Sequence, residues 1–423
     1  DNPFLASFFS VDFVDIAAIV FSLLALLFSY DAFTREKEEA PLKLQMANSL
    51  SRSTALAGKL LGIFATLLPI LVFSFALSAV LVLLARDVAF SALEWGRIAL
   101  LFGASVVYLA VFVFIGVLVS ARSRSSVTSL VVCLFLWVLL VFIVPVVAAN
   151  FAESFTGIAS RDNLDRVLKD IDRERDEEIR RAQAAAGSPE RWNCWWCSSD
   201  EDGVMEIYGS ARPDFENFRR TAMISEPIRV AYADKKWPAQ KAYLDSLFRQ
   251  AGAAESLSFM SPTGLFRAIA SAICRTDLAS HARRMDGTRR YREGFVSWLQ
   301  GEDAFGSFSW ITPTDPATFK TEDELVEKRT GGEFKTAAEY EAWASGQKDF
   351  RARWSKLSAV KLHGDSPDDF PFLDISDMPR FRDQAGSLFS GLESSVLKTG
   401  LLVVATVFLF ALGYVAFIRF DVR

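Results

Sequence analysis

Five long apolar stretches constrain the fold of this chain more than any other feature of its sequence. They cover residues 13–30, 60–85, 98–120, 126–149 and 399–418. None of them carries a Lys, Arg, Glu or His in its middle, and each is close to the roughly 20 residues that a helix needs to cross a bilayer. Buried core helices of a soluble protein are the alternative, but five such lengths with uncharged interiors favour membrane spans.

The charges of the chain are concentrated between the fourth and the fifth apolar stretch. Residues 150–396 contain 34 of the 46 Lys and Arg residues and 41 of the 51 Asp and Glu residues. This segment therefore has the composition of a water-facing domain, whereas the rest of the chain is almost free of charge. The formal net charge of −5 excludes a broad basic surface for nucleic acid.

We predict an all-α polytopic membrane protein that consists of three parts. Residues 1–149 form the first four visible spans, residues 150–396 form a mainly helical extracytoplasmic domain, and residues 397–423 form the last span and a cytoplasmic tail. In the outer domain, helical patterns are expected around 162–186, 226–251, 261–275, 277–300 and 336–358.

The basic residues of the short connections predict the orientation of the spans. Residues 31–59 contain five Lys or Arg residues, and the turn 121–125 and the tail 419–423 contain two each. We expect these three segments on the cytoplasmic side, which places the outer domain and residue 1 on the other side. A sixth span before residue 1 is therefore expected in the intact protein.

Three of the four cysteines belong to the outer domain, which is expected in an oxidising compartment. We therefore predict a disulfide among Cys194, Cys197 and Cys274, with one thiol left over. The Cys194-Trp-Trp-Cys197 spacing also occurs in redox and zinc motifs, and unpaired buried thiols are a third interpretation. A second CxxC motif is missing and the two histidines are far apart in sequence, so no metal site is assigned.

The apolar spans lack the groups on which several classes of membrane protein depend. Ion-driven transporters and proton pumps need carboxylate, His or Lys side chains within the membrane, so transport by this chain would have to be powered from elsewhere. The sequence also lacks the Gly-x-Ser-x-Gly and His-Glu-x-x-His motifs. We expect no catalytic residue and no cofactor in this chain.

The first cytoplasmic connection, residues 31–59, is long, amphipathic and rich in charges of both signs. Such a segment suits a helix that lies at the membrane surface and binds a soluble partner. A solvated loop with helix caps is the simpler alternative. Residues 31–56 are the candidate for such a docking helix.

The order of residues in this connection resembles that in permease subunits of type-two ABC transporters. It runs Glu36, Glu38, Glu39, Leu42, Leu44, Ser51-Arg52 and Gly58-Lys59. In the family, an acidic cluster, Gly-Thr-Leu, an apolar stretch, a Ser/Arg turn and Gly-Lys follow each other in the same way, although here Ala40-Pro41 replaces Gly-Thr. The resemblance implies a coupling helix at about 31–56 and the ATPase-coupling residues Arg35, Glu36, Glu38, Glu39, Leu42, Arg52 and Lys59.

Three further stretches resemble a subgroup of these permeases that has a large insertion before the last span. They are Met260-Ser261-Pro262-Thr263-Gly264-Leu265-Phe266, Thr276-Asp277-Leu278 and Arg419-Phe420-Asp421-Val422-Arg423. Members of the subgroup are associated with gliding motility and with the maturation of multicopper enzymes. The resemblance implies a permease subunit without ATPase activity of its own, which pairs with a separate ABC ATPase that binds ATP and Mg.

We also expect a second permease, identical or homologous, and membrane lipid as partners. Another envelope protein is a candidate partner for the outer domain. We expect the protein to move a substrate across the bacterial inner membrane by alternating access, with a large periplasmic domain. The alternative is a membrane-anchored envelope protein whose outer domain binds a partner without transport, but one anchor would suffice for that role. A membrane enzyme is a third possibility, which no catalytic motif supports.

The predicted orientation can be tested by proteolysis. Protease added to sealed right-side-out spheroplasts should cut within 187–203, a segment that contains Gly, Pro and Asp, and should leave 31–56 intact. Fragment masses identify the sites of cleavage. Cleavage within 187–203 that requires a breached membrane would invert the orientation and would contradict the assignment of 31–56 to the cytoplasmic side.

Overall fold

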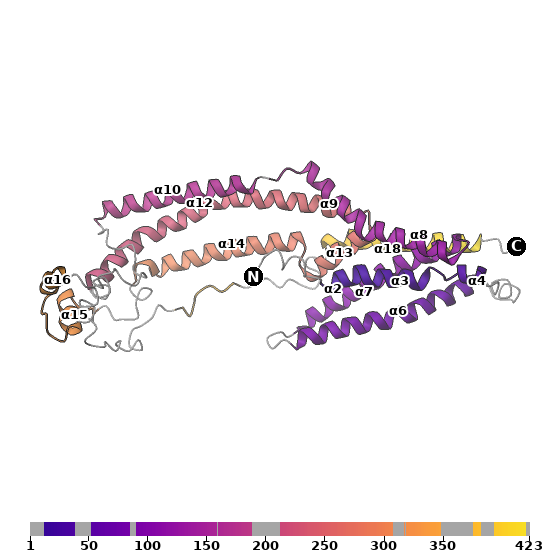
Figure 1. Cartoon of the computed structure of the whole chain (residues 1–423), viewed down its shortest axis with the longest axis horizontal. Coiled ribbons are helices and arrows are strands. Elements are labelled where there is room, and N and C mark those ends of the chain that lie inside the picture. The colour runs from indigo at the N-terminus through magenta and orange to yellow at the C-terminus, as the bar shows by residue number, and fades with distance from the viewer. Residues whose placement is uncertain are drawn as a thin grey trace. The chain divides into compact units, whose positions relative to one another are not determined.

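The computed structural model describes residues 12–38, 52–84, 90–158, 160–187, 212–307, 317, 319–347, 375–381 and 393–419. Helices make up most of this part of the chain, and it contains no β-strand (Figure 1). The chain divides into two compact units. The first contains residues 1–158, 245–285 and 383–423, and the second contains residues 159–244 and 286–382. The predicted all-α class is confirmed.

The first unit contains the apolar helices. Their bounds are α2 (Phe13–Ile16), η1 (Ala17–Phe21), α3 (Ser22–Ser29), α4 (Thr34–Glu38), α6 (Arg52–Leu83), α7 (Ala92–Arg122), α8 (Ser126–Val138), η2 (Leu139–Ile143), α9 (Val144–Phe155), α13 (Pro262–Cys274) and α18 (Glu393–Ile418). The segments η1 and η2 are π-helical turns within otherwise α-helical spans.

Five helices among the described residues are long and apolar enough to cross a membrane. They run over Phe13–Glu38, Ser53–Leu83, Ala92–Arg122, Ser126–Phe155 and Ser395–Ile418. These helices confirm the five predicted spans. Pro69 lies inside α6 and Pro145 lies in the first turn of α9, where neighbouring groups within a membrane protein can satisfy the backbone that proline leaves unpaired.

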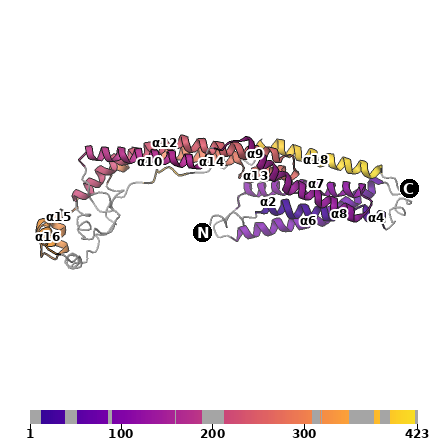
Figure 2. The same cartoon turned by 45° about the horizontal axis from the view of Figure 1, so that its top comes forward.

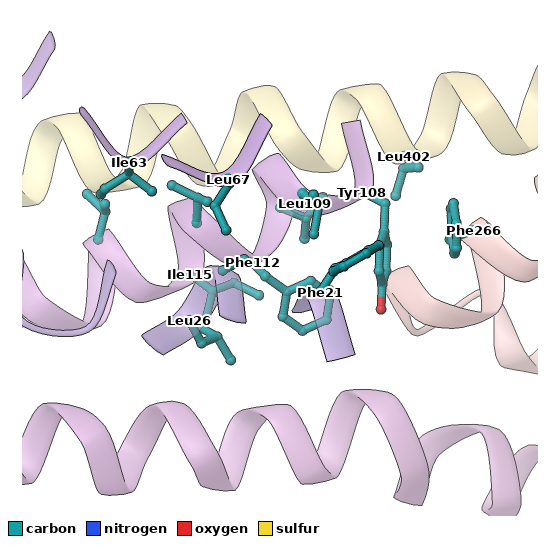
Figure 3. Close-up of a cluster of buried hydrophobic side chains, with 14 of the residues drawn as sticks. Phe21, Leu26, Ile63, Leu67, Tyr108, Leu109, Phe112, Ile115, Phe266 and Leu402 are labelled. Carbon is teal, nitrogen blue, oxygen red and sulfur yellow. The ribbon is translucent and has the colours of Figure 1, made fainter. Parts of the chain in front are cut away.

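Helix α7 forms the centre of the first unit. Helices α3, α8, α13 and α18 all pack against it, and its half from Tyr108 to Ala121 is buried almost all round. Figure 3 shows the side chains that surround it. They come from the first span (Phe21 and Leu26), α6 (Ile63 and Leu67), α13 (Phe266) and α18 (Leu402).

The outer helices expose large apolar side chains. Leu61 of α6 is 70% exposed, Phe135 of α8 is 63% exposed and Val404 of α18 is 65% exposed. In water, contiguous patches of this kind would favour aggregation. Around helices of membrane-spanning length, they are the surface that contacts lipid chains.

Helix α13 belongs to the first unit, although it lies within the segment 150–396 that the sequence predicts to be the outer domain. Leu265, Phe266, Ile269 and Ile273 are buried, and the helix packs against α7 and α18. The first compact unit therefore includes part of the segment 150–396, and the extracytoplasmic position of that segment stays a prediction. Hydropathy could not reveal that α13 belongs to the first unit, because a helix of 13 residues that carries Arg267 is too short to be recognised as a span.

The second unit is built around long polar helices. They are α10 (Arg161–Ala185) together with the greater part of α12 (Arg212–Ser258) and of α14 (Leu278–Gly301), and they lie side by side in both views (Figures 1 and 2). The predicted patterns 162–186 and 277–300 match α10 and α14. The pattern 226–251 is part of α12, a single helix of 47 residues that contains Pro227 and Pro238.

Ion pairs connect these helices. Lys236 of α12 lies 2.5 Å from Asp172 of α10, and its hydrogen bond lowers the pKa of that carboxyl group. Asp234 of α12 pairs with Arg289 and Arg292 of α14 at 2.5 and 2.7 Å. Because most of these groups are partly exposed, each pair contributes at most about 1 kcal/mol.

A small helical hairpin completes the second unit. It consists of α15 (Glu322–Arg329) and α16 (Ala337–Ser345), which follow the short turn η4 (Ala304–Gly306). Both α15 and α16 begin with a capping box, and they enclose Leu325, Val326 and Tyr340. The predicted helical pattern 336–358 covers α16, and its remainder from 348 onward lies outside the described residues.

A close approach between α7 and α3 gives a prediction. A Cβ atom at Gly116 of α7 would lie 1.9 Å from Ser29 Oγ of α3, so Gly116→Ala should destabilise the protein by about 1–3 kcal/mol through overpacking. Gly103 lies in the same helix with nothing within 4 Å of such an atom, and Gly103→Ala is the control. Thermal unfolding of the purified variants measures the difference, and equal midpoints would contradict the close packing.

Candidate functional site

The start of the predicted coupling helix is fixed to the end of α7. The backbone N–H groups of Phe33 and Thr34 both donate to Ser120 Oγ, at 2.9 and 3.2 Å. Phe33 and Thr34 are fully buried, and the Phe33 ring stacks on Phe417 of α18 with the ring centroids 4.2 Å apart. The first backbone N–H groups of a helix have no acceptor within that helix. The hydroxyl of Ser120 therefore accepts from two such groups at the beginning of α4.

Lys37 binds the C-terminal end of α7. Its ammonium group donates to the carbonyl groups of Ser120, Ala121 and Ser123, at 3.0, 2.7 and 3.0 Å. The last carbonyl groups of a helix lack partners within the helix and carry a partial negative charge. A partly buried ammonium group that donates to all three of them is therefore a favourable cap.

Glu38 binds the N-terminal end of α8. Its carboxylate accepts hydrogen bonds from the backbone N–H of Ser126 at 2.9 Å and from the Ser126 hydroxyl at 2.8 Å. A helix N-terminus carries a partial positive charge, so a carboxylate is favourable there. Lys37 and Glu38, which are adjacent in the chain, thus cap two consecutive spans with the charges that each end prefers.

Lys59 connects the same corner to α6. Its ammonium group lies 2.6 Å from the Glu36 carboxylate and 4.6 Å from the centre of the Phe33 ring, and it also donates to the carbonyl of Ala32. The Lys59 and Glu36 side chains are 19% and 23% exposed. We call this group of contacts, which joins residues 32–38 to Lys59 and to 120–126, the coupling joint.

The coupling joint includes three of the predicted coupling residues. Glu36, Glu38 and Lys59 all make contacts within the chain, and Arg35 is exposed. Helix α6 begins at Arg52, and nothing further is described for that side chain. Glu39 and Leu42 lie outside the described residues, so their role stays a prediction.

The sequence alone does not reveal the partners of these coupling residues. Lys37, Ser120 and Ser126 received no role, because the bonds that they make link residues more than 80 positions apart. Two local signals were available. The order Glu36-Lys37-Glu38 alternates in charge, and serines flank the turn 121–125 between two apolar stretches.

The predicted disulfide falls largely outside the described residues. Cys194 and Cys197 belong to the part of the chain that is not described, whereas Cys274 is exposed and carries a free thiol. The pairing between Cys194 and Cys197 thus stays a prediction. Within the described ranges, no three His, Cys, Asp or Glu side chains come together in a way that could hold a metal ion.

The comparison with known protein families identifies the family of this chain. The model of the ABC-2 family transporter protein matches residues 5–422, nearly the whole chain. The chain belongs to the ABC-2 transporter family. It is thus a multi-pass membrane component of a transporter, as the resemblance of residues 31–59 to ABC-2 permeases predicts. Proteins of this family work with an ABC ATPase subunit. None of the curated proteins and none of the solved structures that were compared with it matches.

The family match does not identify the predicted subgroup. The match covers the spans and the segment between the fourth and the fifth span alike. It does not separate ABC-2 permeases that are associated with gliding motility or multicopper enzymes from other members. That part of the resemblance stays a prediction.

The caps on α7 and α8 give a prediction for this ABC-2 protein. Lys37→Met leaves three carbonyl groups without their charged donor and should lower the free energy of unfolding by about 2 kcal/mol. Arg124→Met in the same turn is the control, because Arg124 is exposed and its removal should change the stability by less than about 0.5 kcal/mol. Thermal unfolding in detergent measures both, and equal losses would argue against a special role for Lys37.

Proposed function

We propose that this chain is the permease subunit of an ATP-driven transporter and that residues 31–56 receive the movement of a separate ATPase subunit. The permease moves its substrate by alternating access between two arrangements of its helices. The ATPase subunit binds ATP and Mg. The chain itself supplies the path through the membrane and carries no catalytic residue.

The coupling joint is the observation that carries this proposal. Residues 31–56 connect the first two spans, and the joint adds bonds from α4 to the end of α7, to the start of α8 and to Lys59 of α6. A force on this one segment therefore reaches four spans directly. Paired charges and hydrogen bonds of this kind have discrete arrangements, which is what a switch between two states requires.

The proposed working unit contains two permeases and two ATPases. The second permease is either identical to this chain or homologous to it. We place the complex in the bacterial inner membrane, with the 150–396 segment in the periplasm, where it receives cargo, gates the exit or binds another envelope protein. The basic residues of 31–59, 121–125 and 419–423 support this orientation.

Co-purification tests the proposed function most directly. The full chain, extracted in mild detergent with an affinity tag, should retain an ABC ATPase in stoichiometric amount, and ATP hydrolysis by the complex should respond to the transported substrate. If the chain repeatedly purifies without any ATPase, the result would favour the alternative function, that of a membrane-anchored envelope protein whose outer domain binds a partner without transport.

Variants of 31–56 give a sharper prediction. Reversal of Glu36 or Glu38 would also break their contacts with Lys59 or Ser126, so the test uses Glu39→Lys and Leu42→Asp. Each should weaken binding of the ATPase at least tenfold, about 1.4 kcal/mol, without a change in thermal stability. Binding is measured by titration of the ATPase onto the permease in nanodiscs.

Two controls accompany these variants. Glu153→Lys changes an exposed carboxylate of α9 and should leave ATPase binding unchanged. Lys37→Met shows how damage to the coupling joint itself affects binding, because it also lowers thermal stability. Normal ATPase binding by Glu39→Lys and Leu42→Asp would remove 31–56 as the docking segment.

A further inference from the structure

Charged side chains of three helices come together at the end of the first unit opposite to the coupling joint. Arg267 of α13 lies 2.8 Å from Asp15 of the first span. Cys274 lies seven positions after Arg267, about two helical turns, so both residues are on one side of α13. Partial burial raises the pKa of the Cys274 thiol, the charge of Asp12 raises it further and the charge of Arg97 lowers it. Asp12 and Arg97 therefore lie near this side of α13 as well. We call Asp12, Asp15, Arg97 and Arg267 the charged strip.

The carboxylates in and beside the charged strip have partners within the chain. Asp12 caps the first span, because its side chain accepts from the backbone N–H of Asp15 at 2.8 Å. Asp15 itself pairs with Arg267. Glu94 in the first turn of α7 accepts from the backbone N–H of Ser91 and completes a capping box. The acidic groups are thus bound in place.

The two arginines of the strip have donors left over. Arg97 Nη2 and Arg267 Nε are buried, and no acceptor in the described part of the chain bonds to either nitrogen. A buried donor of a charged group is unfavourable unless an acceptor completes it, and in native proteins a ligand, an ion or water supplies that acceptor. Guanidinium groups carry five N–H donors in a planar arrangement that matches the oxygens of a phosphate. Two such groups in one strip favour a phosphate ligand.

The position of the strip along the spans corresponds to the edge of the hydrocarbon. Asp15 lies 18 residues before Phe33, and Arg97 lies 25 residues before Arg122. These positions are about 27 and 37 Å along their helices from the coupling joint. Because the hydrocarbon of a bilayer is about 30 Å thick, Asp15 lies close to its far edge and Arg97 lies in the layer of the lipid headgroups.

The surroundings of the strip are those of a membrane interface. Trp95 lies two positions before Arg97 and is 46% exposed, and tryptophan is enriched at the level of the headgroups. Exposed apolar side chains follow on the side of the hydrocarbon. They are Ile16 and Val20 of the first span and Leu100 of α7. A lipid whose headgroup lies on the strip therefore finds an apolar surface for its acyl chains.

We propose that the charged strip binds the phosphate group of a phospholipid in the leaflet opposite to the coupling joint. Arg97 and Arg267 donate to the phosphate oxygens from the levels on either side of it. The side chains of Arg267 and Asp15 are 41% and 36% exposed, so the lipid reaches the strip from the bilayer. The site depends only on residues of this chain and goes beyond the proposed function, because it holds whether or not the chain transports a substrate.

Titration with lipid tests the site. The full chain in mild detergent is mixed with phosphatidylglycerol, and native mass spectrometry measures the Kd of the first bound lipid. Arg97→Gln and Arg267→Gln should each raise this Kd about fivefold or more, because each removes charged donors to the phosphate. Diacylglycerol with the same acyl chains, which has no phosphate, should bind to the wild-type chain more weakly by a similar factor. Thermal unfolding without lipid shows that the variants are folded.

A variant of Asp15 separates lipid binding from a purely structural role of Arg267. Asp15→Asn breaks the same ion pair as Arg267→Gln, but it removes a negative charge and leaves Arg267 in place. It should therefore leave the Kd for phosphatidylglycerol unchanged or lower it. Arg249→Gln is the control for a change of charge, because Arg249 is an exposed residue of α12 in the same unit. It should leave the Kd unchanged.

Several outcomes would overturn the lipid site. They are a wild-type Kd in both arginine variants, equal binding of diacylglycerol and phosphatidylglycerol, and a rise in Kd for Asp15→Asn or Arg249→Gln equal to that for Arg267→Gln. Inorganic phosphate at millimolar concentration should not displace the lipid, because it gains nothing from the apolar surface beside the strip. Displacement by inorganic phosphate would assign the two arginines to free phosphate and would also overturn the lipid site.

Discussion

Within the hydrocarbon of a bilayer, every backbone polar group has to find its hydrogen-bond partner inside the protein. In the first unit, hydrogen bonds within each helix meet this requirement along the spans, and side chains meet it where helices end. Lys37 donates to three carbonyl groups at the end of α7, and Glu38 accepts from the backbone N–H at the start of α8. The turn between α12 and α13 follows the same rule through Ser261, whose hydroxyl donates to the carbonyl of Leu140 and accepts from the backbone N–H of Thr263.

Much of this architecture can be predicted from the sequence, and the reasons why the rest cannot are physical. Long uncharged stretches predict the five spans, and helical periodicity predicts α10, α13 and α14. Periodicity cannot tell what a helix of 13 residues packs against, so α13 was placed in the outer domain. Local sequence likewise marks 31–59 as the charged connection, but it does not reveal that Glu38 faces Ser126, which lies 88 positions away.

The polar contacts of the membrane unit gather in two groups with an apolar core between them. The coupling joint binds the first span, α6, α7 and α8. The second group lies at the end of α12 and in α13, and it binds the first span, α7, η2 and α18. The first span, α7 and the span Ser126–Phe155 take part in both groups. The first span and α7 also pack closely at Gly116 and Ser29. Helices α6 and α18 contribute charged contacts to one group each, through Lys59 and Lys398.

The boundaries between the two compact units fall inside helices rather than in loops. Helix α12 runs from Arg212 to Ser258 and the boundary falls after residue 244, and α14 runs from Leu278 to Gly301 and the boundary falls after residue 285. Cutting a helix in its middle leaves four amide or four carbonyl groups unpaired at each new end. An inserted segment that interrupts the helix at either boundary would produce that damage. Positions in this chain that tolerate an inserted domain are therefore expected elsewhere than at the boundaries between its two compact units.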